Sequence, residues 1–141
     1  MPRADRKADV AGEWVEKAES DLTAAVSLLN IAKRKPTDVV CFHAQQCVEK
    51  YLKAFLAMQG IDFPKTHQIE EIIRLLPTGV EAGLSPEEQR VLTGYAVTTR
   101  YSGAYEAITM REARDALSMM RRVRRNIRRL LPRAAKTRRM A

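Results

Sequence analysis

The chain has 141 residues, 45% of them hydrophobic and 6% aromatic, which fits one domain that can bury a sizeable core. The low aromatic content and the six glycines argue against an all-β fold. No apolar run approaches the roughly 18 residues of a transmembrane helix, and the first residues lack the apolar core of a signal peptide. Cys41 and Cys47 form neither a disulfide framework nor a metal knuckle. We therefore expect a cytoplasmic protein with no membrane segment, metal or cofactor.

The net charge of +8 is unevenly distributed along the chain. Residues 111–141 contain twelve basic and two acidic residues, whereas residues 1–110 carry a net charge of −2. This pattern predicts a nearly neutral domain with a basic last helix and tail. Such a surface attracts phosphate groups by releasing counterions, but it carries no sequence information of its own.

Five helices and no strand are predicted. The first spans about residues 10–33, and the residues expected on its inward face recur every three or four positions: Val10, Trp14, Ala18, Leu22, Ala25, Leu29 and Ala32. The second begins at Thr37, a plausible N-cap, and runs to Met58. Gly60 ends it, because glycine tolerates a left-handed turn.

The remaining helices are indicated by their capping residues. The third is short, has Thr66 as a possible cap and ends before Pro77. The fourth opens with the capping box of residues 85–88 and runs to about residue 100. The fifth opens with a second capping box, residues 109–112, and Pro132 ends it. Its apolar side is formed by Ala113, Ala116, Leu117, Met120, Val123, Ile127, Leu130 and Leu131.

Short connections between long helices favour antiparallel neighbours. We therefore predict an all-α fold, a four- to five-helix up-and-down bundle formed by residues 1–132. Residues 133–141 are expected to be a disordered basic tail.

The second helix carries polar residues beside its apolar stripe. Val40, Ala44 and Phe55 mark the inward face, together with one of each neighbouring pair at 47–48 and 51–52. The flanks or back of this helix are predicted to hold Phe42, Gln45, Gln46, Glu49, Lys50 and Lys53. The pair Glu49–Lys53 has the favourable i, i+4 order. These side chains are either solvated or part of a dimer interface or ligand edge, and periodicity alone leaves both interpretations open.

Three segments in order carry a family resemblance: FHAQQCVEKYLKAFLAMQG at 42–60, PKTH at 64–67 and TTRYSG at 98–103. Together with features of the first helix, they resemble the HEPN domain over about residues 10–131. The matching residues are Asp21, Leu22, Ala25, Gln46, Glu49, Lys50, Leu52, Lys53, Ala54, Leu56, Lys65, Thr66, His67, Arg100 and Tyr101.

The resemblance implies a helical bundle, a homodimer and a location in prokaryotic cytoplasm. Many members of the family accompany a small nucleotidyltransferase in a toxin–antitoxin pair, and others are metal-independent ribonucleases with an Arg-x4–6-His motif at the dimer cleft. By this resemblance, the cleft that could hold a nucleotide or RNA would involve Gln46, Glu49, Lys50, Lys53, Lys65, Thr66, His67 and Tyr101.

The ribonuclease motif is incomplete in this chain. Counting from Arg100, the motif histidine should fall at 105–107, but these residues are Tyr105, Glu106 and Ala107. Cleavage of RNA without a metal needs a group that titrates near neutral pH, and tyrosine, with a pKa of about 10, is a poor base. Arg100 could still hold a phosphate. The first hypothesis is therefore a dimeric interaction module, and the second is a ribonuclease using Arg100 with Tyr105, Glu106 or His67.

The two histidines and the arginines of the last helix each have a structural alternative. His67 could help Lys65 bind an anion, or Thr66 and His67 could simply pack the turn, and His43 is expected to be structural or interfacial. The arginines that flank the last helix could bind nucleic acid or form a solvated face. They include Arg121, Arg122, Arg125 and Arg129, proposed for nucleic acid, with Arg124 and Arg128 between them.

Overall fold

A computed structural model of the chain describes residues 3–31, 33–97 and 107–137, and the side chains from residue 6 onward within these ranges. No strand occurs in these parts of the chain. The helices in chain order are α1 (Arg3–Leu29), α2 (Thr37–Gln59), α3 (Ile69–Ile73), α4 (Pro86–Gly94), α5 (Met110–Arg128) and α6 (Arg133–Lys136). The predicted all-α class and helical bundle are therefore confirmed.

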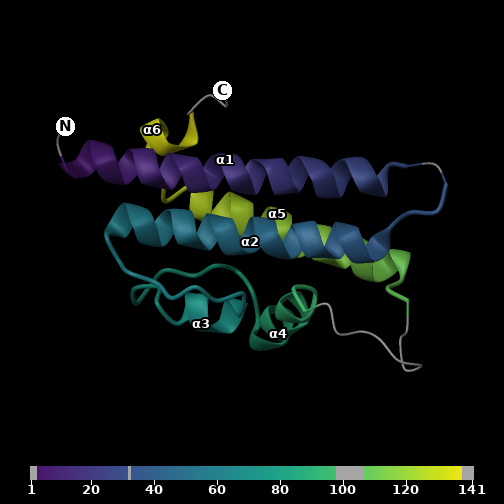
Figure 1. Cartoon of the computed structure of the whole chain (residues 1–141). Helices are drawn as coiled ribbons and strands as arrows, with labels where there is room; N and C mark the ends of the chain where they lie inside the picture. The colour runs from purple at the N-terminus through teal and green to yellow at the C-terminus, as the bar shows by residue number, and fades with distance from the viewer. Residues whose placement is uncertain (1–2, 32, 98–106, 138–141) are drawn as a thin grey trace.

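The three long helices α1, α2 and α5 form the body of the bundle (Figure 1). Helices α1 and α2 lie side by side and antiparallel, and α5 packs against both of them. The short helices α3 and α4 together form the returning leg, so α5 runs in the same direction as α2 (Figure 1). This arrangement puts α2 at the centre, in contact with α1, α3, α4 and α5.

The central position of α2 explains its burial. Every residue predicted for its inward face is buried, including both members of the pairs Cys47–Val48 and Tyr51–Leu52. The helix ends where predicted: Gly60 has φ +71°, and its N–H donates to the carbonyls of Leu56 and Ala57. These two bonds satisfy carbonyls that a helix end otherwise leaves without partners.

Helix starts agree with the predictions to different degrees. Ser85 and Glu88 form the complete predicted capping box, and Thr109 Oγ1 accepts from the N–H of Glu112. The prediction for Thr37 is wrong: it lies within the first turn of α2, and its hydroxyl donates to the carbonyl of Ile108, 2.6 Å away. Thr66 does not cap α3 either, because Gln68 occupies the N-cap position.

The predicted inward face of α1 is wrong at its first position. Val10 is 46% exposed, whereas Ala11 and Val15 are buried. Ala11, Ala18 and Ala25 face the core. Such small side chains let neighbouring helices approach closely. The buried face of α1 therefore begins at Ala11 rather than at Val10. Trp14 is consequently only half-buried, at the edge of the α1–α2 contact.

The expected boundaries of the fourth helix and of the tail also differ from the structure. Helix α4 ends at Gly94, six residues before the predicted end. Residues 133–136, assigned to a disordered tail, form α6, which packs on α1 and buries Ala135. None of the helices in the described ranges combines the length and apolarity needed to cross a bilayer.

Candidate functional site

Helix α2 carries a buried row of four polar side chains, which we call the α2 polar row: Gln45, Gln46, Glu49 and Lys53. Their exposures are 0%, 9%, 2% and 8%. The interpretation of these residues as a solvated flank is therefore wrong. A buried polar group is costly unless it is hydrogen-bonded, so the partners of this row define its role.

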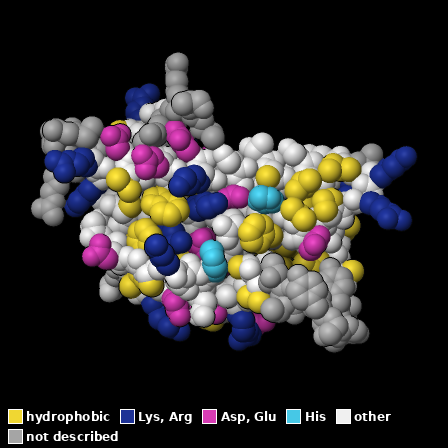
Figure 2. Space-filling model, viewed as in Figure 1, with side chains coloured by type: hydrophobic (Ala, Val, Ile, Leu, Met, Phe, Trp, Pro, Cys, Tyr) yellow, Lys and Arg dark blue, Asp and Glu magenta, His cyan; other side chains and the backbone are white. Residues whose placement is uncertain are grey.

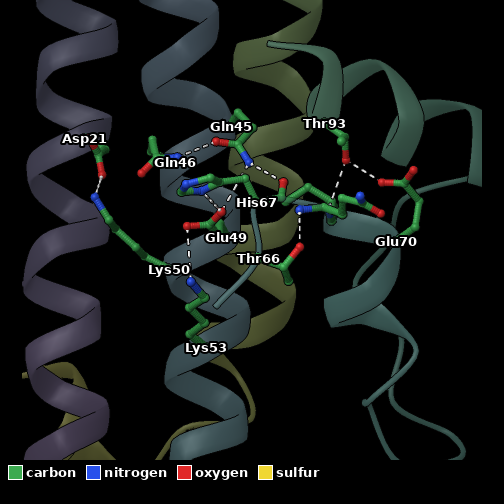
Figure 3. Close-up of polar contacts among 12 residues, drawn as sticks. Asp21, Gln45, Gln46, Glu49, Lys50, Lys53, Thr66, His67, Glu70 and Thr93 are labelled. Carbon is green, nitrogen blue, oxygen red and sulfur yellow. Dashed lines mark hydrogen bonds and ion pairs between the residues drawn. The ribbon is translucent and has the colours of Figure 1, made fainter. Parts of the chain in front are cut away.

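The α2 polar row holds the turn at residues 65–67 against the bundle (Figure 3). Gln46 Nε2 donates to Gln45 Oε1 over 2.6 Å, and Gln45 Nε2 donates to the carbonyl oxygen of His67 over 3.0 Å. The Nδ1 atom of His67 lies 2.9 Å from Glu49 Oε1. Because a carboxylate only accepts, Nδ1 carries the hydrogen. Backbone and side chain of His67 thus bind the same helix.

Glu49 is the charged centre of this arrangement. Its second oxygen, Oε2, lies 3.3 Å from Lys53 Nζ, which confirms the predicted pair and shows that the pair is buried. The same ammonium group lies 5.4 Å from the ring centroid of Trp14 and 5.8 Å from that of Phe63. Lys53 therefore connects Glu49 to the rings of Trp14 and Phe63 at the edge of the α1–α2 contact.

The turn is also fixed to α4. Thr66 Oγ1 accepts from the N–H of Gln68. Thr93 of α4 accepts from the N–H of Ile69 over 2.9 Å and donates to a carboxylate oxygen of Glu70. The start of α3 is thus held from two sides, as Figure 3 shows. These contacts support the interpretation that Thr66 and His67 pack the turn.

A second polar cluster lies where α2 faces α1. Asp21 is 8% exposed, and its two oxygens bind Lys50 Nζ at 2.5 Å and His43 Nδ1 at 2.8 Å. The ring of His43 packs edge-on against Phe42. His43 therefore has a structural partner, which agrees with the role expected for it.

A third cluster joins α1, α2 and α5 around Glu19. Arg124 binds the Glu19 carboxylate through two nitrogens, at 2.7 and 2.9 Å, and the Tyr51 hydroxyl donates to it over 2.8 Å. Burial alone would raise the pKa of Glu19, but the hydrogen bonds from Arg124 and Tyr51 outweigh it and hold that pKa below its ordinary value. Burial, together with the bond to Glu19, raises the pKa of Tyr51.

The arginines of α5 divide into paired and unpaired groups. Arg122 NH1 donates to both oxygens of Glu88 and to the carbonyl of Gly83, and Arg128 NH1 donates to the Tyr51 hydroxyl. Arg129 is exposed and binds Asn126 on its own helix. These contacts, with that of Arg124, are structural.

Arg114, Arg121 and Arg125 are exposed, and none has an ion pair or a hydrogen bond within the described part of the chain. They line an open groove of about 430 Å³ together with Leu117, Ser118 and Arg122. This surface, which we call the α5 groove, leaves three positive charges without an acidic partner. A polyanion is the natural complement of such a surface.

Some predicted site residues cannot be placed. Arg100, Tyr101, Tyr105 and Glu106 lie outside the described residues, so a cleft formed by them with the α2 polar row stays a prediction. Lys65 is exposed at the docked turn. Both cysteines are buried, and within the described ranges no three acidic, histidine or cysteine side chains gather as a metal site would require.

The fold and the docked turn define a helical domain in which a buried polar row of the central helix holds a lysine–threonine–histidine turn. The HEPN domain family model matches residues 11–130, and the chain belongs to the HEPN family. The crystal structure of an archaeal HEPN homologue is similar, with a TM-score of 0.61 and 23% identity over 94% of this chain and 100% of that one. No curated protein matches the sequence.

The Glu19 cluster was not predicted from the sequence. Glu19 and Arg124 are 105 residues apart, so no local spacing links them. A signal did exist for Asp21: an acid on a helix face otherwise bearing Ala18, Leu22 and Ala25 needs a buried cation. The α5 groove was indicated by Arg121 and Arg125, and the signal for Arg114 is its spacing of seven residues from Arg121, which puts both on one face of the helix.

Proposed function

We propose that this HEPN protein binds single-stranded RNA through the α5 groove. The observation that carries the proposal is the set of three exposed arginines, Arg114, Arg121 and Arg125, with no acidic partner. Arginine presents a planar fork that suits phosphate oxygens better than the point charge of lysine. Arg124, which binds Glu19, and Arg122, which binds Glu88 at the edge of the groove, hold the helix in place.

The geometry of the α5 groove suits contacts with the phosphate backbone of RNA rather than with its bases. The three arginines lie seven and four residues apart on one helix, a rise of about 10 and 6 Å, so they form a stripe along α5. Single-strand binding combines such a charged groove with aromatic rings on which bases stack. No aromatic residue lines the α5 groove. The expected binding is therefore insensitive to sequence and strongly dependent on salt.

Binding of a fluorescein-labelled single-stranded RNA of about twelve nucleotides, a length within the usual range of single-strand sites, tests this proposal by fluorescence anisotropy. The double variant Arg121→Gln/Arg125→Gln should bind more weakly than the wild type. The variant Lys33→Gln/Arg74→Gln removes the same charge from exposed positions outside the groove and should bind like the wild type. Equal weakening by both variants would show a general charge effect and contradict the proposal.

We propose further that the protein is a homodimer. Val39 and Phe42 of α2, and Ile31 just after α1, are large apolar side chains exposed at the same end of the α1–α2 pair. Their exposure supports an apolar contact between two copies. Light scattering during size-exclusion chromatography should give twice the chain mass of 16.0 kDa for the wild type and the single mass for Phe42→Asp. A monomeric wild type would refute the dimer.

The pairing with a small nucleotidyltransferase in a toxin–antitoxin system rests on the family resemblance. A short nucleotidyltransferase frame beside the gene for this chain, and co-purification of the two proteins, would support it. Separate elution of the co-expressed proteins would count against it.

The alternative function is a ribonuclease that uses Arg100 with Tyr105, Glu106 or His67. It makes a prediction distinct from binding: RNA incubated with the protein would be shortened, and Arg100→Ala would leave it intact. RNA that stays intact with the wild type would contradict this alternative.

A further inference from the structure

A second groove, of about 500 Å³, lies between the first half of α1 and the end of α2 with the chain that follows it. Its lining residues are Arg6, Lys7, Val10, Trp14, Ala57, Gly60, Ile61, Asp62 and Phe63. Figure 2 shows hydrophobic side chains flanked by both basic and acidic side chains over this part of the bundle. Binding sites for small organic molecules usually enclose about 300–1,000 Å³ and have apolar walls with a few polar groups, so the size and the lining of this groove are suitable.

The floor of the groove is aromatic and aliphatic. The rings of Trp14 and Phe63 meet edge to face, with 6.0 Å between their centroids. Val10 is 46% exposed beside them, although it lies on a helix that packs into the core. The exposed Val10 side chain and the half-buried Trp14 ring together leave an apolar surface that a planar molecule could cover.

Cations lie at both ends of this apolar floor. Arg6 and Lys7 are at one end, and neither has an ion pair within the described part of the chain. The ammonium group of Lys7 lies over Gly60, at the end of α2 where carbonyl groups make the helix pole negative. At the other end, Lys17 is exposed, with Nζ 5.3 Å from the Trp14 centroid.

Among the residues that line this groove, the basic ones outnumber the acidic ones. Asp62 is the acidic residue among those lining it, and it is exposed. Lys53 also lies over Trp14, but its charge is balanced by Glu49. Arg6 and Lys7 therefore lie at one end of an aromatic floor, and Lys17 lies near its other end. Along α1, residues 6 and 17 are separated by a rise of about 16 Å, the length available to a ligand.

We propose that this groove binds a small planar aromatic molecule that carries an acidic group. Its ring system would cover Val10 and pack against Trp14 and Phe63, and its acidic group would bind Arg6 and Lys7. This site lies on α1 and α2, away from the α5 groove. It needs no RNA, so its test is independent of the function proposed above.

Trp14 is the chain's single tryptophan, so its fluorescence reports on the groove directly. We would titrate the full-length protein with 1-naphthyl phosphate, following the fluorescence, and measure the affinity in parallel by calorimetry. Saturable quenching with one site per chain is expected. The neutral 1-naphthol should bind about tenfold more weakly, and Arg6→Gln/Lys7→Gln should weaken 1-naphthyl phosphate by about the same factor, which is the effect of losing about one strong polar contact.

Two variants complete the test. Val10→Asp places a negative charge on the exposed floor without removing a core residue and should abolish binding. The charge-matched control Lys33→Gln/Arg74→Gln should bind 1-naphthyl phosphate like the wild type. Absence of quenching in the wild type, equal binding of 1-naphthol, or equal weakening by the control would each overturn the proposal. If inorganic phosphate displaced 1-naphthyl phosphate completely and bound with the same affinity, the aromatic ring would contribute nothing to binding. That result would overturn the proposal that the groove recognises an aromatic molecule.

Discussion

His67 and Glu49 are eighteen residues apart, and a contact of 2.9 Å between Nδ1 and Oε1 joins them. His67 is largely exposed, with 69% of its side chain accessible, whereas the Glu49 side chain is 3% exposed. The contact therefore connects a surface turn to the interior of the bundle. It explains why a histidine and a buried acid occur together in this chain, and it assigns both to the positioning of the turn.

Replacing Glu49 should destabilise the fold. Glu49→Gln removes the charge that balances Lys53, and removal of one partner from a buried ion pair typically costs about 3 kcal/mol or more. Urea unfolding followed by circular dichroism would measure the loss. Glu87→Gln is the matched control, because Glu87 pairs with Arg90 on the surface, and such a pair contributes about 0–1 kcal/mol. Equal stability of Glu49→Gln and the wild type would contradict the role given to Glu49.

The stability should fall in acid partly because of Glu19. The pKa of Glu19 is lower in the folded protein than the ordinary value of 4.5. Its contribution is therefore complete above about pH 4.5 and is lost as the pH falls through the lower folded value. Glu19→Gln should be less stable at pH 7 by about 1–3 kcal/mol and should lose less further stability on acidification. If the unfolding free energy of Glu19→Gln depended on pH in the same way as that of the wild type, Glu19 would not contribute to the loss of stability in acid.

Glycines 60 and 94 should respond to alanine in opposite directions. Gly60 has φ +71°, and a Cβ there would lie 2.8 Å from Lys7 Nζ, so Gly60→Ala should cost about 1–2 kcal/mol. Gly94 is helical with open space around it, so Gly94→Ala should stabilise by about 0.5–1 kcal/mol. Thermal unfolding of both variants would measure the two changes in stability. The same sign for both changes would show that backbone conformation does not decide the effect.

The two thiols should be unreactive in the native protein. Cys41 and Cys47 are both fully buried, and burial raises the pKa of Cys47, which lowers the thiolate fraction on which reactivity depends. Ellman's reagent should therefore detect no thiol within minutes under native conditions and both thiols in denaturant. Rapid reaction of a native thiol would mean that the packing around α2 opens readily.

The sequence predicted those features that depend on short-range chemistry. The capping box at Ser85 and the glycine end of α2 follow from residues only a few positions apart, and both are present. The prediction for Val10 is wrong, because apolarity alone favours valine for the core as much as alanine, and only the packing of α1 against α2 distinguishes Val10 from Ala11. The burial of Gln45 could not be predicted from helical periodicity, because it depends on a turn 22 residues away that covers it.

The salt dependence of RNA binding tests the proposed function most directly. Each phosphate contact to a single strand contributes about −0.7 to the slope of log K against log salt concentration. If Arg121 and Arg125 both bind phosphates, Arg121→Gln/Arg125→Gln should reduce the steepness of the slope by about 1.4, while Lys33→Gln/Arg74→Gln leaves it unchanged. A slope in the groove variant equal to that of the wild type would contradict RNA binding through the α5 groove.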